Sequence, residues 1–392
     1  MNLNFVSFQG IHADKRAWGM VQIMEPISDE IGVHHHYYVS RAPKNHKYFV
    51  EISPIHKILE RLFWALGIRL NIHVGLLRYL QEISFDFFSS RLLKYPCILV
   101  STAYIPSAAQ KNMSAGGINV FVAGNPYDSL INSILERENN KYKIKNQSAY
   151  TFKPRLKFID RFLSFQNEII FQTAVTYNSY RNSVHSSKKT LIPFELIPNS
   201  NFFKDINIEK RECITFIYLA SSVWLKGLTY LIEAWNSLDN LNARLIIVGS
   251  IYPDVLESIQ NNLTSSIELM GFVPGSTINS LYRSCHVCIV PSLADNHPST
   301  IAEAMYCGLP VIATSECGSC RLIVDGGTGF IVPSADSSVL AEKIRWFLQN
   351  PGLIKPMGQA ARATIDAIDK QAQVSAMAHC IRNNLDRIGS LK

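Results

Sequence analysis

The second half of the chain alternates short apolar runs with amphipathic segments, and this alternation constrains the fold more than any other feature of the sequence. The apolar runs are rich in β-branched residues and lack polar alternation, which is typical of parallel strands buried on both faces. The alternation therefore predicts a doubly wound parallel sheet with a ligand crevice at the carboxyl ends of its strands. The expected strands are 214–220, 244–250, 266–272, 287–292 and 310–314, and the expected helices are 227–238, 253–262, 276–284, 299–307 and 336–349.

The first half is less regular but similar in kind. Its candidate strands are 3–8, 35–40, 97–102, 119–124, 172–177 and 194–198, with long helical stretches at 51–94 and 127–145. The polar segment 199–212 is the expected boundary. The 392 residues suit two domains with a core each. The prediction is an α/β protein of two Rossmann-like domains, 1–199 and 200–370, followed by a C-terminal helix at 371–392 that packs back on the first domain.

Composition excludes several classes of protein. With 47% hydrophobic and 18% charged residues, the chain is neither disordered nor collagen-like. No uninterrupted apolar run approaches the roughly 18–20 residues that a membrane span needs. The start, MNLNFVSFQG, resembles a first strand rather than a signal peptide. A cytoplasmic protein is expected, and its eight cysteines are then expected to be thiols.

The positive charge is concentrated in the first half. Residues 1–200 hold 23 Lys and Arg against 14 Asp and Glu, whereas residues 201–392 hold 15 against 17. The first half is thus expected to face something anionic, a phospholipid surface or a phosphate-bearing substrate. Nucleic acid is not expected, because no zinc finger, RNP or helix-turn-helix signature is present.

One stretch of the first half combines positive charge with large apolar side chains. Residues 56–94 carry six Lys and Arg among many large apolar residues, including Phe63 and Trp64. This composition predicts contact with an anionic membrane surface. The alternative is ordinary packing of amphipathic helices on the sheet. A second basic cluster, from Arg137 to Lys157, could meet an acceptor phosphate.

The segment 291–314 carries the sharpest chemical signal. A strand ends, a loop follows, and a helix begins near Ser299, with Ser299 or Thr300 as the expected cap. Such a helix N-terminus at the strand ends favours an anion such as pyrophosphate. Asp295 on the loop could bind sugar hydroxyls, and Glu303, one turn into the helix, could accept hydrogen bonds from ribose.

This segment also resembles a known family. Asp295-x7-Glu303, followed by Ala-Met-Tyr-Cys-Gly-Leu-Pro-Val, is similar to the E-x7-E signature of retaining glycosyltransferases of family 4, with Asp in place of the first Glu. The resemblance implies that Asp295 contacts the donor sugar and Glu303 the ribose of a nucleotide-sugar. The residues that would line the sugar and phosphates are Asn296, His297, Pro298, Ser299 and Thr300.

A Lys-Gly pair upstream agrees with this resemblance. Lys226, in a strand-loop-helix segment like that of the family, would neutralise the donor pyrophosphate and act with Asp295 in catalysis. The loop residues Ser221 and Ser222 would also contact the donor. Ser221 stands where family members often have an Arg, so one phosphate contact is missing or supplied elsewhere.

The same resemblance bears on four other positions. Gly271 and Phe272 lie in a segment like the one that holds the base, although an aromatic residue there could equally belong to the core. Arg321 occupies a position where the family usually has Glu. In the first domain, Asn125 stands where many members have a His that contacts the donor sugar, which makes it a candidate on the acceptor or sugar side.

The resemblance implies the GT-B architecture, two Rossmann-like domains facing across a cleft. It implies transfer of a sugar, with retention, from a nucleotide-sugar to a glycan or lipid-linked glycan. The expected setting is bacterial surface polysaccharide or lipopolysaccharide synthesis at the inner face of the cytoplasmic membrane. No metal or other cofactor is expected, because Lys226 and the helix N-terminus take the place of a metal. Two alternatives stay open: a catalytically silent GT-B binding or partner subunit, and a nucleotide-sugar 2-epimerase.

The cysteine spacing offers a different interpretation. Cys285-x2-Cys288 and Cys317-x2-Cys320 could together form a four-thiolate zinc site. However, Cys288 falls inside an expected buried strand, and free buried thiols are common core residues. Core thiols are therefore favoured over zinc.

Overall fold

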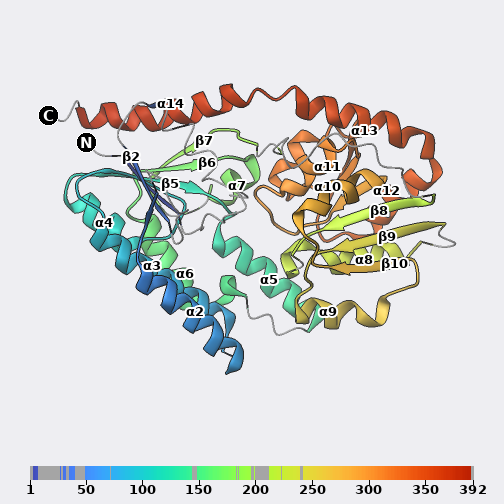
Figure 1. Cartoon of the computed structure of the whole chain (residues 1–392), viewed down its shortest axis with the longest axis horizontal. Coiled ribbons are helices and arrows are strands. Elements are labelled where there is room, and N and C mark those ends of the chain that lie inside the picture. The colour runs from blue at the N-terminus through green and yellow to red at the C-terminus, as the bar shows by residue number, and fades with distance from the viewer. Residues whose placement is uncertain are drawn as a thin grey trace. The chain divides into compact units, whose positions relative to one another are not determined.

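The computed structural model describes residues 3–7, 27, 30–31, 35–39, 49–70, 72–143, 148–181, 183, 185–195, 198, 212–221, 223–238 and 242–389. The chain divides into two compact units (Figure 1). The first comprises Met1–Ser133, Asn146–Phe194 and Lys370–Lys392, and the second comprises Ile134–Lys145 and Glu195–Asp369. The units thus divide after residues 194 and 369, where the sequence suggested 199 and 370.

The first unit is built on a seven-stranded parallel sheet with the order β3-β2-β1-β4-β5-β6-β7. Its strands are β1 (Leu3–Ser7), β2 (His35–Val39), β3 (Phe49–Glu51), β4 (Ile98–Ser101), β5 (Ile118–Ala123), β6 (Glu168–Phe171) and β7 (Lys188–Leu191). Its helical segments are α2 (Pro54–Arg69), α3 (Val74–Leu92), α4 (Pro106–Ser114), η1 (Ala149–Thr151), α6 (Lys153–Leu163), α7 (Ala174–Ser179) and α14 (Lys370–Gly389). Helix α5 (Asp128–Tyr142) begins in this unit and ends in the second.

Two strands expected in this unit are wrong. Residues 172–177 do not continue β6, because the side chain of Thr173 accepts a hydrogen bond from the Thr176 amide and starts helix α7. No strand forms in the described part of 194–198. The sheet ends instead at β7, whose Lys-Lys-Thr-Leu sequence lacks an apolar run because an edge strand is only half covered.

The C-terminal helix α14 belongs to the first unit, which confirms the expectation that it packs back on the first domain. Asn384 on α14 donates a hydrogen bond to Glu168 on β6 at 2.8 Å. Burial alone would raise the pKa of Glu168, but hydrogen bonds from Thr190, Lys188 and Asn384 outweigh it and lower this pKa. A buried, ionised carboxylate thus joins α14 to β6, the neighbour of the edge strand β7.

The second unit contains a six-stranded parallel sheet with the order β10-β9-β8-β11-β12-β13. Its strands are β8 (Ile214–Leu219), β9 (Ala243–Val248), β10 (Ile267–Gly271), β11 (Val287–Val290), β12 (Val311–Thr314) and β13 (Gly329–Val332). Its helical segments are η2 (Trp224–Lys226), α8 (Leu228–Asn236), α9 (Pro253–Ile259), η3 (Gln260–Asn262), α10 (Gly275–Ser284), α11 (Ser299–Tyr306), η4 (Gly318–Leu322), α12 (Ser337–Gln349) and α13 (Pro351–Asp366).

This strand order is that of the Rossmann fold. The chain reverses direction across the sheet between β8 and β11, which lie side by side in the middle. In an open parallel sheet, ligands bind at such a switch point, outside the carboxyl ends of the strands. The residues that follow β8 and β11 are therefore the first place to look for a site. Among the residues that the structure describes, no helix meets the length and hydropathy that crossing a membrane requires.

Candidate active site

The two residues expected to carry the chemistry meet at the switch point. Lys226 follows β8, Asp295 follows β11, and the Lys226 ammonium forms an ion pair with the Asp295 carboxylate. Burial alone would lower the pKa of Lys226, but the Asp295 charge outweighs it and raises this pKa. Lys226 is therefore a fixed cation at the carboxyl end of the sheet, with its side chain still 29% exposed.

A glycine brings these two strand ends together. Gly227 has φ +68°, and a Cβ atom at this position would lie 1.9 Å from the carbonyl oxygen of Pro291. Only glycine combines this left-handed backbone with such close approach to the segment after β11. The Leu293 amide also donates to the Leu225 carbonyl at 2.7 Å, so the two loops are joined through their backbones.

The loop that carries Asp295 is held on its other side as well. The Asp295 amide donates to the Glu316 carbonyl at 3.0 Å, and the Gly318 amide donates to the Asp295 carbonyl at 2.9 Å. These bonds fix the loop backbone against the segment that follows β12. These backbone hydrogen bonds consequently hold the Asp295 carboxylate in position.

Helix α11 begins directly after this loop. The expected cap by Ser299 or Thr300 is wrong, because Pro298 occupies the N-cap position and no side chain caps the helix. Amide N–H groups at an uncapped N-terminus can donate to an anion, which the helix dipole also favours. The lack of a cap therefore suits a phosphate better than the expected cap would.

Glu303 lies within α11 and is buried, with 3% of its surface exposed. The Tyr282 hydroxyl on α10 donates to its carboxylate at 3.2 Å. Burial and the nearby Glu303 charge raise the pKa of Tyr282 far above its usual value, so this hydroxyl keeps its proton and donates. Sequence reasoning missed Tyr282, because nothing in the helix pattern distinguishes it from a core aromatic.

The other residues expected to contact the sugar donor lie on different elements of the fold. Gly271 and Phe272 are at the carboxyl end of the edge strand β10, and Phe272 is 80% exposed, so it is not a core aromatic. Ser221 follows β8 and is exposed, whereas Ser222 lies outside the described residues. Asn125 follows β5 in the first unit and is exposed.

The unusual Arg321 is paired with a carboxylate that sequence reasoning also missed. Arg321 donates to Glu195 at 2.6 Å, and Ser319 donates to the other oxygen of Glu195 at 2.9 Å. The same oxygen lies 3.4 Å from Nδ1 of His297, in the loop before α11. Glu195, the first residue of the second unit, is 3% exposed. The cation at position 321 thus has a buried acidic partner.

The cysteines behave as core residues. Cys285, Cys288 and Cys317 are buried, and burial raises the pKa of Cys317 to about 12. Buried thiols of this kind pack as small apolar side chains. Within the described ranges, no group of three or more His, Cys, Asp or Glu side chains is arranged to hold a metal ion.

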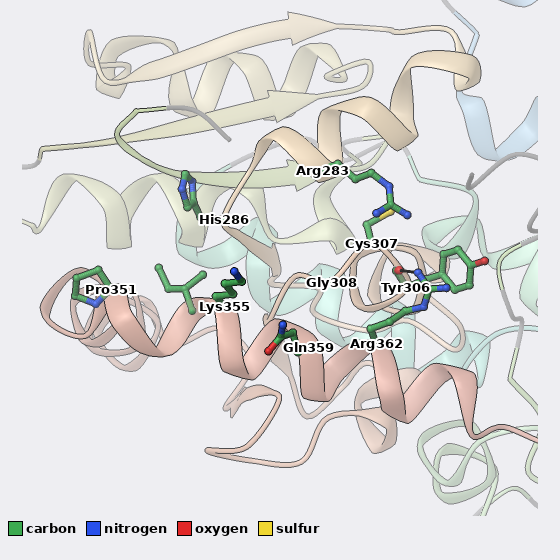
Figure 2. Close-up of a pocket in the computed structure, with 10 residues that line it drawn as sticks. Arg283, His286, Tyr306, Cys307, Gly308, Pro351, Lys355, Gln359 and Arg362 are labelled. Atoms are coloured by element: carbon green, nitrogen blue, oxygen red, sulfur yellow. Dashed lines mark hydrogen bonds between the residues drawn. The ribbon is translucent and has the colours of Figure 1, made fainter. Parts of the chain in front are cut away.

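A separate hollow of about 530 Å³ lies at the amino ends of β11 and β12, opposite the switch point. Figure 2 shows Lys355, Gln359 and Arg362 along α13, with Arg283 across the hollow. Much of its charge is already engaged: Arg362 donates to Asp366 at 2.8 Å and to the Tyr306 carbonyl at 2.8 Å. Arg362 thus stabilises the carboxyl end of α11, and the hollow is not part of the candidate active site.

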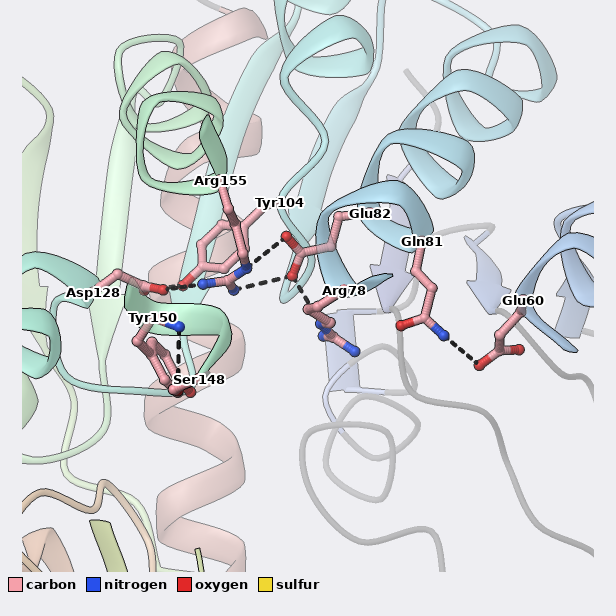
Figure 3. A network of polar contacts seen from close by, with 9 residues as sticks. All are labelled: Glu60, Arg78, Gln81, Glu82, Tyr104, Asp128, Ser148, Tyr150 and Arg155. Carbon is pink, nitrogen blue, oxygen red and sulfur yellow. Dashed lines mark hydrogen bonds and ion pairs between the residues drawn. The ribbon is translucent and has the colours of Figure 1, made fainter. Parts of the chain in front are cut away.

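The first unit has its own buried polar network near the carboxyl ends of β4 and β5 (Figure 3). Arg155 on α6 lies between two carboxylates, donating to Glu82 at 2.9 and 3.0 Å and to Asp128 at 2.7 Å. The Tyr104 hydroxyl also donates to Asp128, at 2.8 Å. This network joins α3, α5 and α6 and fixes the loops that follow β4 and β5.

Known proteins share this fold. Sucrose-phosphate synthase from Thermosynechococcus elongatus superposes with a TM-score of 0.68 at 17% identity, over 98% of this chain and 100% of that one. Anabaena HepE in complex with UDP-glucose superposes with a TM-score of 0.63 at 14% identity, over 99% and 100%. Two Rossmann-like units in one chain with these neighbours define the GT-B class, which confirms the expected fold.

The family model described as glycosyl transferases group 1 matches residues 199–364. This range covers nearly all of the second unit, which is therefore similar to the glycosyl transferases group 1 family. The uncharacterized glycosyltransferase MJ1178 of Methanocaldococcus jannaschii is 31% identical over 143 residues, which are 36% of this chain and 40% of that protein. The lipopolysaccharide glucosyltransferase WaaG of Escherichia coli is 26% identical over 49% of this chain and 53% of its own length.

A longer match exists with a relative of known acceptor. The N,N'-diacetylbacillosaminyl-diphospho-undecaprenol alpha-1,3-N-acetylgalactosaminyltransferase of Campylobacter jejuni is 22% identical over 78% of this chain and 78% of its own length. The matches to MJ1178 and WaaG span about half of those proteins or less.

Proposed function

We propose that this chain is a retaining glycosyltransferase that moves a sugar from a nucleotide-sugar to a saccharide acceptor. The observation that carries the proposal is the Lys226–Asp295 ion pair beside the uncapped N-terminus of α11, at the switch point of a Rossmann-order sheet. This arrangement places a cation, helix amides and a carboxylate within one site. A diphosphate needs the first two, and a sugar hydroxyl needs the third.

The two charged residues have different duties in this proposal. When the donor binds, Lys226 exchanges its ion pair with Asp295 for the diphosphate, and the released carboxylate accepts hydrogen bonds from the sugar. At about 4 Å and an effective dielectric constant of about 20, a cation–phosphate contact contributes about 4 kcal/mol before desolvation. The contact strengthens as the leaving diphosphate gains charge in the transition state, so it accelerates the reaction rather than only tightening binding.

The proposed transfer exchanges one bond at the anomeric carbon for another. The acceptor oxygen bonds to the anomeric carbon on the face from which the diphosphate leaves, while the bond from that carbon to the phosphate oxygen breaks. The acceptor hydroxyl gives its proton to the departing phosphate. The chain contributes mainly orientation and charge stabilisation. Since Lys226 and the α11 amides stabilise the diphosphate, we propose that no metal is needed.

The acceptor is proposed to be a lipid-linked saccharide of a bacterial surface polysaccharide or lipopolysaccharide. The names of the Campylobacter and Escherichia coli relatives support this proposal, since they specify a diphospho-undecaprenol acceptor and lipopolysaccharide respectively. We propose that the first unit, including Asn125, binds this acceptor. A lipid-linked acceptor requires the enzyme to work at a membrane, here the inner face of the cytoplasmic membrane.

An exposed apolar surface on helix α2 of the first unit supports the proposed work at a membrane. Ile55, Ile58, Leu62 and Leu66 follow one another at helical spacing and are 48–57% exposed. Lys57, Arg61 and Arg69 lie on the same helix and complement an anionic lipid surface. We propose that this apolar stripe, rather than Phe63 and Trp64, inserts into the membrane. Phe63 is partly buried, and the Trp64 side chain lies outside the description.

The test is to detect transfer and its stereochemistry. The full chain is incubated with a panel of nucleotide-sugars and a diphospho-undecaprenol-linked saccharide, and the anomeric configuration of the product is read by proton NMR. The proposal expects a product that keeps the donor configuration. An inverted product refutes retention, and an epimerised sugar formed from the donor alone identifies an epimerase. A donor that binds without any transfer to the acceptor supports the silent binding subunit instead.

A further inference from the structure

His297 in the loop before α11 has one engaged and one unpartnered ring nitrogen. Its side chain is 7% exposed. Nδ1 lies 3.2 Å from the Ser319 hydroxyl and 3.4 Å from Glu195. Nε2 is buried and has no hydrogen-bond partner among the residues that the structure describes. A buried, unpartnered polar atom in the loop that also carries Asp295 points to a group that the ligand supplies.

The hydrogen bonds of Ser319 determine whether Nδ1 of His297 carries a proton. Ser319 has a single hydroxyl proton, and it donates that proton to Glu195 at 2.9 Å. Ser319 can therefore only accept from His297, so the imidazole carries its proton on Nδ1. The carboxylate of Glu195 beside Nδ1 favours the same arrangement. In the neutral ring, Nε2 then presents a lone pair, which is a hydrogen-bond acceptor.

Arg321 is the charge partner of the buried Glu195 side chain. Glu195 has side-chain exposure of 2%, and a buried charge of this kind needs a partner. Arg321 supplies it, through a hydrogen bond to the Glu195 oxygen that Ser319 and His297 do not contact. The cation at 321 and the acid at 195 therefore act as one element that orients the loop histidine.

We propose that Glu195 is a positioning residue that holds His297 in the Nδ1–H tautomer, so that Nε2 accepts a hydrogen bond from a hydroxyl of the donor sugar. This rests on the proposed function, and it deepens it by naming the part of the donor that His297 recognises. A diphosphate oxygen cannot donate a hydrogen bond, so a neutral Nε2 selects the hydroxyl-bearing sugar over the phosphates.

The tautomer is measured first, without any donor. Nitrogen-15 labelled histidine is introduced into the full chain, and two-bond correlation spectra distinguish Nδ1–H from Nε2–H rings. The His297 signal is identified by its loss in His297→Gln. The proposal expects the Nδ1–H form in the wild type and in Ser319→Ala, where Glu195 still faces Nδ1. It expects Nε2–H in Glu195→Ala, where Ser319 is free to donate to Nδ1.

The donor contact is measured second, by calorimetric titration with UDP and with UDP-glucose, or with the nucleotide-sugar that binds in the panel above. His297→Asn keeps an amide near the Nδ1 position and lacks an atom at Nε2. It is expected to bind UDP like the wild type but UDP-glucose about 3- to 10-fold more weakly. His297→Gln, which extends an amide to the Nε2 position, should recover part of the loss.

Different results would contradict the proposed function and the roles of Glu195 and His297. Failure of every nucleotide-sugar to bind the wild type contradicts the proposed function, and the tautomer spectra still decide the role of Glu195. A proton on Nε2 in the wild type, in an Nε2–H ring or in a doubly protonated ring, overturns the positioning role, as does an unchanged tautomer in a folded Glu195→Ala variant. Equal losses of UDP and UDP-glucose affinity in His297→Asn overturn the sugar contact. Should Glu195→Ala fail to fold, the wild-type and Ser319→Ala spectra carry the test alone.

Discussion

Replacing Arg155 with Met removes the cation that lies between two buried carboxylates of the first unit. Glu82 and Asp128 are 2% and 1% exposed, so neither can turn to water when Arg155 is lost. Methionine has a similar length but donates no hydrogen bond. The variant therefore leaves two acidic groups in the interior with fewer donors than they need.

The size of the effect follows from the donors that remain. Breaking a buried ion pair by removing one partner costs about 3–5 kcal/mol. Here Glu82 keeps a hydrogen bond from Arg78 at 3.0 Å, and Asp128 keeps one from Tyr104 at 2.8 Å. These contacts place the expected loss at the lower end, about 3 kcal/mol. At about 2–4 °C per kcal/mol for a unit of this size, the melting temperature should fall by about 6–12 °C.

The loss should also depend on pH. Burial raises the pKa of Asp128 in the native protein, and Arg155 opposes this rise. Without Arg155 the pKa of Asp128 rises further, so the folded state holds a proton that the unfolded state has released. Stability then falls as pH increases from the unfolded pKa, near 4, towards the folded one. The deficit of Arg155→Met should accordingly be larger at pH 8 than at pH 5.

The assay is differential scanning calorimetry of the full chain, with hydrogen exchange of α3 and α6 to assign the transition to the first unit. The matched control is Arg161→Met, which removes an exposed arginine of the same helix that donates to the exposed Gln110 at 2.7 Å. Combining Arg155→Met with Glu82→Gln and Asp128→Asn should restore most of the stability, because no buried charge is left. Equal melting temperatures for Arg155→Met and Arg161→Met would refute the reasoning.

Three further predictions concern the second unit and the membrane. Glu303→Ala should destabilise the fold by about 1–3 kcal/mol, because the buried Tyr282 hydroxyl loses the Glu303 carboxylate as its acceptor. Adding Tyr282→Phe should recover part of this loss in the same calorimetric scan. Transfer activity should be unchanged after dialysis against EDTA, and a loss that Mg²⁺ or Mn²⁺ restores would contradict metal-independent transfer. The double variant Leu62→Glu, Leu66→Glu should reduce co-sedimentation of the protein with anionic liposomes. The control Leu353→Glu, at a similarly exposed leucine of α13, should not. Equal recovery of all the proteins with the liposomes would show that α2 does not insert.

The sequence predicted the second unit well because its central strands are buried on both faces. Such strands are continuous apolar runs, and β8, β9 and β11 stand out by composition alone. Strand β13, Gly-Phe-Ile-Val, was missed because it is short and preceded by glycines. In the first unit, β7 was missed because half-covered edge strands carry polar residues. Helix α7 was predicted as a strand because its capping residue, Thr173, occurs within an alternation of apolar and polar residues.

The same contrast holds for the site. Lys226 and Asp295 were predictable because each follows a strand, and the carboxyl ends of neighbouring parallel strands meet at one edge. Glu195 was not, because its partners Arg321 and Ser319 come from a distant part of the chain, and a buried charge leaves no local pattern. On α2 the composition predicted an amphipathic surface, but the helix is apolar on more than one face. Packing alone decides that Leu62 and Leu66 are exposed while Phe63 is partly covered.

The central claim is that Lys226 binds the diphosphate of a nucleotide-sugar, and equilibrium binding tests it most directly. A panel of UDP-, GDP-, ADP- and dTDP-sugars is titrated calorimetrically into the wild type, Lys226→Ala and the control Lys343→Ala. Lys343 is a matched lysine, since it also pairs with a carboxylate, at 2.8 Å, and its side chain is 26% exposed. The account predicts that one nucleotide-sugar binds the wild type and Lys343→Ala alike and binds Lys226→Ala at least about tenfold more weakly, a loss of about 1.4 kcal/mol. Binding that is unchanged in Lys226→Ala, or the absence of binding by any diphosphate sugar, would contradict it.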